Sequence, residues 1–235
     1  MPSLVNRKFR EWTEGLDTHQ GMISVFEHIR DIPYSLEVAR HDPVAGPEEM
    51  LRIGKGYCGP KHYLLAEMFR KLNLNVVYAT IAFSWNDPDL RYPPALRELA
   101  VHIPVAHHLA CRVQIGCRWA LADATWDRPL ARAGFPVNEH WDGYADTRWA
   151  VKPLRSPVRT AFCRTLTNEP CRTKDEAELL PVDGEKDHWD AEDHARFYRG
   201  KVSARTPDDL ERIARFYREF DAWLIRVRQE TGPLS

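Results

Sequence analysis

The strongest constraint on the fold is a helix that begins beside a cysteine and is followed at once by an apolar strand. Apolar residues recur at helical spacing after Cys58, at Leu64, Leu65, Met68 and Leu72, which predicts an amphipathic helix. Pro60 suits the first turn of that helix, where a missing N–H costs nothing. Residues 76–83 then read as a buried strand. This order of elements makes the start of the helix a candidate site.

Cys58 falls at or near the N-cap of this helix. The unsatisfied N–H groups and the positive end of the helix dipole point at its sulfur. Both favour the thiolate, and reactive cysteines in such places have pKa values of roughly 3.5–7.5. Gly56 and Gly59 leave the approach to the sulfur open. The alternative is a buried, inert cysteine that caps a core helix, and this segment alone leaves both interpretations open.

A hairpin follows about fifty residues later. Residues 108–114 and 117–123 read as two strands joined by the two-residue loop Ile115-Gly116, in which glycine supplies the unusual φ of such a turn. This register places His108 directly opposite Asp123. An aspartate there can accept the proton of one imidazole nitrogen and leave the other nitrogen free to act as a base. The alternative is an ordinary half-exposed hairpin that carries an unrelated His and Asp.

The residues around the hairpin resemble the transglutaminase-like superfamily, which shares the papain-like cysteine protease architecture. In that family a cysteine opens a core helix, a histidine opens a strand, and an aspartate follows across the hairpin before a Thr-Trp-Asp-like run. Here the run is Asp123-Ala124-Thr125-Trp126-Asp127, and fifteen positions separate His108 from Asp123, a common family interval. Residues 29–34 and 49–58 resemble the segments that precede the cysteine in bacterial and archaeal members. The resemblance covers roughly residues 20–150.

This resemblance implies an α+β fold in which a nucleophile-bearing helix packs on an antiparallel sheet, with a helical C-terminal extension. It implies Cys58 as the nucleophile, His108 as general base and acid, and Asp123 as the group that orients the imidazole, with no cofactor. The reaction implied is attack on an amide or acyl carbonyl through an acyl-enzyme. Hydrolysis of a peptide-like amide by a protease or amidase is the leading form, and transglutaminase-type transfer to an amine is the other.

Two alternatives to that reaction stay open. Acyl transfer of the arylamine N-acetyltransferase kind uses the same triad. The competing class is a non-catalytic binding module that keeps a transglutaminase-like fold for its groove. Departures from the family pattern motivate it, because Ala110 and Arg112 replace a frequent aromatic and a Glu or Asn, and Ala124 replaces a proline. Arg52 stands where a papain-type oxyanion glutamine would sit, so the backbone N–H of Cys58 is the expected oxyanion donor.

Composition sets the outer limits. The chain has 235 residues, of which 43% are hydrophobic and eight are Trp, which is enough for one substantial core. We therefore expect a single domain, 1–235, with a core of about residues 20–150 and a C-terminal extension of about 151–235 packed on it. The net charge of −1 gives no reason to expect nucleic acid or an anionic membrane as a general partner. The expected partner is a peptide or protein amide substrate, and the oligomeric state is open.

The predicted location is the cytoplasm. The first residues lack the apolar core of a signal peptide, and no run reaches transmembrane length. The number of cysteines, five, is odd, and their spacing fits no zinc knuckle. Reduced thiols are the simplest interpretation, with a pairing of Cys163 with Cys171 as an unsupported alternative.

Elsewhere the pattern predicts helices and loops. Residues 20–31 read as a helix, 84–100 as a long surface excursion able to roof a groove, 149–151 as a strand, and 176–193 as an acidic linker or short helix. Thr206-Pro207-Asp208-Asp209 is a strong helix start, followed by an apolar stripe to Val227 that predicts packing on the domain. The pentapeptide Ala-Arg-Phe-Tyr-Arg occurs at 195–199 and again at 214–218, which we attribute to helical, arginine-rich composition.

Other candidate chemistry is weaker. A metal site could gather His102, His107, His108, Asp123 and Asp127, but neighbouring strand residues such as His107 and His108 point to opposite faces, so no metal is expected. His62 is expected on the surface, pointing away from the sulfur. Arg112 and Trp119 are expected to stack across the hairpin as a structural cation–π pair.

Overall fold

The protein is a mixed α+β structure built on a four-stranded antiparallel sheet. It is described here from a computed structural model, which covers residues 3–36, 42–154, 185–188 and 190–230. The strands are β1 (Val76–Phe83), β2 (Ala106–Ile115), β3 (Arg118–Ala122) and β4 (Glu185–His188), in the order β3-β2-β1-β4. The apolar strand predicted at 76–83 is confirmed with the same bounds.

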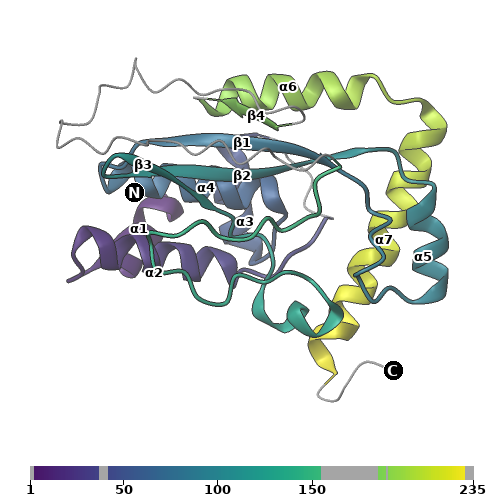
Figure 1. The fold of residues 1–235 in the computed structure, drawn as a ribbon, viewed down its shortest axis with the longest axis horizontal. Coiled ribbons are helices and arrows are strands. Elements are labelled where there is room, and N and C mark those ends of the chain that lie inside the picture. Colours follow the sequence, from purple (N-terminus) through teal and green to yellow (C-terminus); the bar gives the residue numbers. More distant parts are fainter. Residues whose placement is uncertain (1–2, 37–41, 155–184, 189, 231–235) are drawn as a thin grey trace.

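Helices lie on both sides of this sheet (Figure 1). On one side are α1 (Leu4–Thr13), α2 (Thr18–Arg30), α3 (Ala45–Ile53) and α4 (Cys58–Lys71), of which α4 contacts β1 and β2. On the other side is α6 (Ala191–Ser203). Helices α5 (Pro94–Val101) and α7 (Pro207–Gln229) pack side by side at one end of the sheet, and the short 3₁₀-helix η1 (Arg128–Ala133) also contacts α7.

Helix α4 begins at Cys58, as predicted, but it is not amphipathic. Every residue from Gly59 to Ala66 is buried, and so are Met68 and Phe69. Lys61 and His62 are therefore interior residues, and the expectation that His62 lies on the surface is wrong. The ammonium of Lys61 donates to three backbone oxygens, at 2.9 Å to Arg30, 2.8 Å to Ile32 and 2.7 Å to Thr125. A lysine fits inside because these acceptors replace the water that it loses.

The hairpin forms with a register two residues away from the predicted one. Ile115 pairs with Arg118 and Cys111 pairs with Ala122, so the loop is Gly116-Cys117 rather than Ile115-Gly116. Gly116 takes a φ of +59°, a left-handed conformation that glycine adopts without a steric penalty. His108 is therefore not directly opposite Asp123, and that prediction is wrong. Because side chains alternate with a period of two, a two-residue shift leaves both residues on the same face.

Two clusters of buried side chains form the core. One lies between α1–α4 and the sheet, and the other is rich in aromatic rings and lies between α5, α7 and the segments around Trp85 and Trp126. The helix predicted to begin at Thr206 is confirmed, with Thr206 as N-cap in a capping box. Its packing on the domain is also confirmed, because Phe216, Phe220 and Leu224 are fully buried in the second cluster.

Buried polar contacts hold α7 in place. Arg228 donates to both carboxylate oxygens of Asp127 at 2.8 Å and to the carbonyl of Tyr34 at 2.9 Å. Asp221 accepts from the hydroxyl of Ser35 at 2.7 Å and from the N–H of Leu36. A carboxylate that is buried and fully hydrogen-bonded costs much to leave unpaired, so these contacts fix α7 against the loop that precedes α3.

Several sequence predictions need correction. The helix predicted at 20–31 is confirmed as α2, whereas α1 and β4 were not predicted. Residues 149–151 form a loop rather than a strand, and part of the predicted acidic linker is strand β4. The cysteines of the alternative pairing, Cys163 and Cys171, lie outside the described residues.

The thiols also differ from expectation at one position. Cys58 and Cys111 are free, whereas Cys117 is disulfide-bonded. The expectation of reduced thiols is wrong for Cys117.

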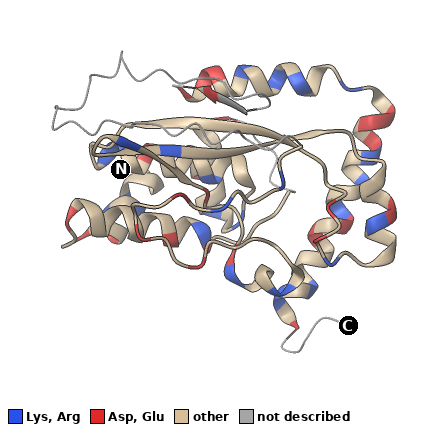
Figure 2. Ribbon diagram, in the orientation of Figure 1, with Lys and Arg blue, Asp and Glu red and all other residues tan. Residues whose placement is uncertain are grey.

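Charge differs between the two last helices. In α6 the acidic residues occupy the first turn and basic residues follow, whereas Lys or Arg and Asp or Glu are mixed along α7 (Figure 2). Strand β1 carries no charged residue. Among the residues that the structure describes, no helix combines the length and apolar character needed to cross a bilayer.

Candidate active site

The fold brings together the three residues that the sequence singled out. Cys58 is the first residue of α4, His108 is the third residue of β2, and Asp123 directly follows β3. Helix α4 packs against β2, so the start of the helix meets the face of the strand that carries His108. His108 is 2% exposed and Asp123 is 1% exposed, which removes the pair from bulk water.

His108 and Asp123 form a short hydrogen bond. Nε2 of His108 lies 2.7 Å from Oδ2 of Asp123. The side chain of Cys58 is among the groups that raise the pKa of His108, and both residues line the same cavity. The imidazole thus has the carboxylate bonded on one side and the thiol close by, which are the parts that a nucleophile, a base and an orienting group require.

The carboxylate of Asp123 is fixed by further donors. Its Oδ2 accepts from the N–H of Ala150 at 2.8 Å, and its Oδ1 accepts from the hydroxyl of Thr125 at 2.6 Å. Its own N–H donates to Thr147 at 3.0 Å. The sequence reasoning named Asp123 but missed Ala150 and Thr147, because their segment follows the hairpin by a long irregular loop.

Electrostatics favour a charged pair at this position. Burial alone would lower the pKa of His108, but the charge and hydrogen bond of Asp123 and the contact with Cys58 raise that pKa well above its ordinary value. Burial alone would raise the pKa of Asp123, but His108 and the hydroxyl of Thr125 hold it below its ordinary range. Each partner therefore stabilises the charged form of the other, imidazolium and carboxylate.

His62 supports the same site from within α4. Its Nδ1 lies 2.8 Å from the carbonyl of Cys58, and the N–H of Ala124 donates to its Nε2 at 3.0 Å. A carbonyl can only accept and an N–H can only donate, so these partners select the neutral tautomer with the proton on Nδ1. Burial is the main cause that lowers the pKa of His62 to about 4.

The hydrogen bond from Ala124 to His62 gives a reason for the alanine at position 124, one of the differences from the transglutaminase-like pattern that the sequence resembles. Ala124 stands where family members often have proline. A proline there would have no N–H to donate to Nε2 of His62, and His62 is buried with that nitrogen at 3.0 Å from the Ala124 nitrogen. The alanine at position 124 and the histidine at position 62 are therefore complementary in this chain.

The other sequence candidates serve different roles or lie apart. Asp127 is held by Arg228, and His107 points to the opposite face, with its ring 5.5 Å from that of Phe197 in α6. The described residues contain no group of three or more His, Cys, Asp or Glu side chains placed to hold a metal. Arg112 lies opposite Leu121 rather than Trp119, and its guanidinium lies over the ring of Trp149 at 6.0 Å. The side chain of Arg52 is 69% exposed on α3.

The thiol opens into a small cavity of about 30 Å³ with largely aromatic walls. Its lining includes Tyr34, Tyr57, Trp85 and Trp126 from the core and Tyr198 and Tyr217 from the last two helices. The repeated pentapeptide carries these last two residues, at the fourth position of each copy. Sequence reasoning missed them, and the repeat was the signal that could have found them. Helices α6 and α7 thus each contribute one tyrosine to the wall of the cavity beside Cys58.

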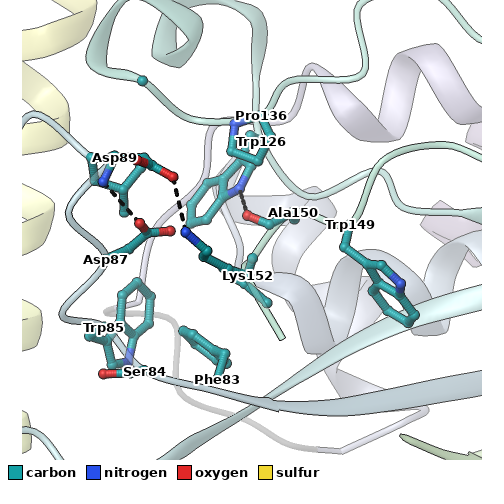
Figure 3. Close-up of a pocket in the computed structure, with 13 residues that line it drawn as sticks. Phe83, Ser84, Trp85, Asp87, Asp89, Trp126, Pro136, Trp149, Ala150 and Lys152 are labelled. Atoms are coloured by element: carbon teal, nitrogen blue, oxygen red, sulfur yellow. Dashed lines mark hydrogen bonds and ion pairs between the residues drawn. The ribbon is translucent and has the colours of Figure 1, made fainter. Parts of the chain in front are cut away.

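A second cavity, of about 280 Å³, adjoins the first. The two share Phe83, Trp85, Trp126 and Val151 as walls. In the lining of the larger cavity Lys152 extends toward Asp89, with Asp87 beside it (Figure 3). The predicted excursion at 84–100 supplies one side of this space, although it contains helix α5 and the buried residues Trp85, Leu90 and Tyr92.

Comparison of the chain with protein-family models, with curated proteins and with solved structures gave no match.

Proposed function

We propose that the protein is a cysteine-dependent enzyme that attacks an amide or acyl carbonyl through Cys58, on a transglutaminase-like, papain-related core. The observation that carries the proposal is the buried pair of His108 and Asp123, with 2.7 Å between Nε2 and Oδ2, in a cavity lining that also contains Cys58. The position of Cys58 at the first residue of α4 supports it, because a helix N-terminus stabilises a thiolate.

In this proposal His108 rests as an imidazolium beside the thiolate and later donates its proton to the leaving amine. The thiolate attacks the carbonyl carbon, and the backbone N–H of Cys58 donates to the oxyanion. Collapse of the tetrahedral intermediate gives an acyl-enzyme and the free amine. Water, deprotonated by His108, then releases the acid and restores the thiolate. Asp123 keeps the imidazole oriented throughout.

Hydrolysis of a peptide-like amide is the form of the reaction that we propose. Transfer of the acyl group to an amine would follow the same first half, with an amine in place of water. Transfer would require a site that admits the amine and excludes water. The aromatic cavity beside the thiol favours neither hydrolysis nor transfer by itself. Analysis of the products shows whether water or an amine accepts the acyl group.

The test is trapping of the acyl-enzyme. The full chain is mixed with p-nitrophenyl acetate, and intact and peptide mass spectrometry locate the added acetyl group. We expect it on Cys58, with its formation lost in Cys58→Ala and reduced at least about 100-fold in His108→Ala. Cys111→Ala is the matched control, because Cys111 is also free but fully buried, and burial raises its pKa. Full acylation and turnover in Cys58→Ala would end the proposal.

The same experiment addresses the non-catalytic alternative. A binding module with an idle triad would give a Cys58 that alkylates with an ordinary thiol pKa near 8.5 and forms no acyl-enzyme. The specific observation in its favour is the small volume, about 30 Å³, left beside the thiol. Rapid alkylation of Cys58 by iodoacetamide below pH 7 that depends on His108 would contradict the alternative.

A further inference from the structure

The larger cavity beside the candidate active site is where a substrate can extend from the thiol. The space at Cys58 holds only about 30 Å³, which is enough for a carbonyl group and little else. The neighbouring cavity of about 280 Å³ shares four wall residues with it. This volume lies just below the roughly 300–1,000 Å³ of pockets for drug-sized ligands, so it suits a single long side group.

The walls of this cavity have a defined chemistry. Three indoles line it, those of Trp85, Trp126 and Trp149, together with Phe83. Indole faces attract cations more strongly than other aromatic rings do. Trp85 is 4% exposed, and its indole nitrogen has no hydrogen-bond partner among the described residues.

The charged residues of the larger cavity are not among the walls that it shares with the cavity at the thiol. Asp87 and Asp89 line the larger cavity, and the backbone N–H of Asp89 donates to Asp87 at 2.9 Å, which fixes the first carboxylate (Figure 3). The ammonium of Lys152 lies 3.4 Å from Asp89, and both side chains are well exposed. The protein thus places its own lysine ammonium against the carboxylate of Asp89, and this exposed pair is open to exchange with another cation.

We propose that this cavity is the specificity subsite for the side group of the acyl donor, and that it selects a long aliphatic chain ending in a cation, as in a lysine side chain. The methylene groups would lie along Phe83 and the indoles, and the ammonium would reach Asp87 and Asp89 in exchange for Lys152. The inference rests on the proposed function, because it assigns the substrate of the same thiol.

The test compares two esters that differ only in the terminal ammonium. These are the p-nitrophenyl esters of Nα-acetyl-lysine and Nα-acetyl-norleucine. Each kcat/KM is divided by the rate constant for hydrolysis of the same ester by free imidazole, which corrects for the difference in intrinsic reactivity. For the full chain we expect the corrected ratio to favour the lysine ester on the order of tenfold. Asp87→Asn keeps the shape of the side chain and its oxygen acceptor, and it should bring the ratio close to one.

Two further variants sharpen the comparison. Lys152→Ala removes the competing ammonium and should lower KM for the lysine ester without changing that for the norleucine ester. Asp208→Asn, an exposed aspartate in the first turn of α7, is the matched control and should leave the ratio as in the unmodified chain. Turnover of both esters through Cys58 with a ratio near one would overturn the subsite and leave the proposed function standing. Failure of Cys58 to form an acyl-enzyme with either ester would overturn both.

Discussion

At the scale of the residue, the site depends on which nitrogen of each histidine carries a proton. His62 is held neutral by one acceptor and one donor, the carbonyl of Cys58 and the N–H of Ala124. His108 lies between Cys58 and Asp123, and the carboxylate favours its charged form. The two rings meet edge to face at 6.0 Å. A neutral ring beside a charged one avoids the repulsion that two imidazolium ions would have in a buried place.

The neutral state of His62 predicts that acid destabilises the fold. Its pKa is lowered to about 4 in the folded state and is near 6.5 when unfolded. Between these values the unfolded chain binds a proton that the folded chain does not, so stability falls as the pH falls. We expect a loss of up to about 3 kcal/mol from this group across that window.

Urea unfolding from pH 7 to pH 4 measures this effect. The decline should be shallower in His62→Gln, which cannot titrate, than in the unmodified chain. The exposed His140 supplies the control, because His140→Gln should keep the original slope. Parallel slopes in all three proteins would show that His62 does not stay neutral.

At the scale of the element, α4 contributes both to the stability of the fold and to the candidate active site. The helix carries Cys58 at its first residue and is buried along most of its length. The ammonium of Lys61 joins it to the carbonyls of Arg30, Ile32 and Thr125. Those three carbonyls belong to the end of α2, to the loop after it and to the loop after β3. One side chain thus joins α4 to the segment that follows Asp123.

Replacing this lysine should therefore cost far more than replacing an exposed one. Lys61→Met keeps much of the volume but leaves three carbonyls without their donor, and we expect a loss of about 3 kcal/mol in the free energy of unfolding. Lys71→Met is the matched control in the same helix. Lys71 forms an exposed pair with Glu67 at 3.3 Å, so its loss should cost less than about 0.5 kcal/mol. Equal losses in urea unfolding would refute the special role of Lys61.

Some helices and strands could be predicted from the sequence because local patterns specify them. The helix at 20–31, the strand at 76–83 and the capped start at Thr206 followed from local periodicity and capping. The prediction that His108 and Asp123 lie on the same face of the hairpin is correct although the predicted register is wrong. The register differs by two residues, and an even shift does not change the face on which a side chain lies. Helix α1 was not predicted, although its apolar residues Val5, Phe9 and Trp12 recur at helical spacing.

Contacts between distant segments could not be read from local patterns. Strand β4 exists because its backbone pairs with β1, more than a hundred positions earlier, and its sequence Glu-Lys-Asp-His lacks the residues typical of strands. The burial of Lys61 and His62 depends on acceptors and donors from three other segments. Tertiary packing overrides local propensity in both cases.

At the scale of the whole molecule, the last two helices enclose the thiol. Tyr198 of α6 and Tyr217 of α7 line the cavity at Cys58. Helix α7 is held by the buried contacts of Arg228 and Asp221. Access to the thiol therefore depends on the side chains that these helices contribute as well as on the sheet and α4.

Removing one of these tyrosines should expose the thiol. In Tyr198→Ala we expect Cys58 to react with iodoacetamide about tenfold faster, equivalent to about 1.4 kcal/mol of easier access. Peptide mass spectrometry over time gives the rate, with the buried Cys111 as the internal reference. Tyr144→Ala is the control, because Tyr144 is 55% exposed and lies outside the lining of this cavity. An unchanged rate in Tyr198→Ala would mean that this tyrosine does not limit entry.

The contacts that hold α7 in place can form only late in synthesis of the chain. Arg228 is 101 positions from Asp127 and 194 positions from Tyr34, whereas Cys58, His108 and Asp123 all lie in the first 123 residues. At roughly 5–20 residues per second, a ribosome needs on the order of 5–20 s to make the stretch between Asp127 and Arg228. Cys58, His108 and Asp123 are therefore synthesised well before α7, and Cys58 lacks the side chains of α7 until Arg228 has emerged and that helix has docked.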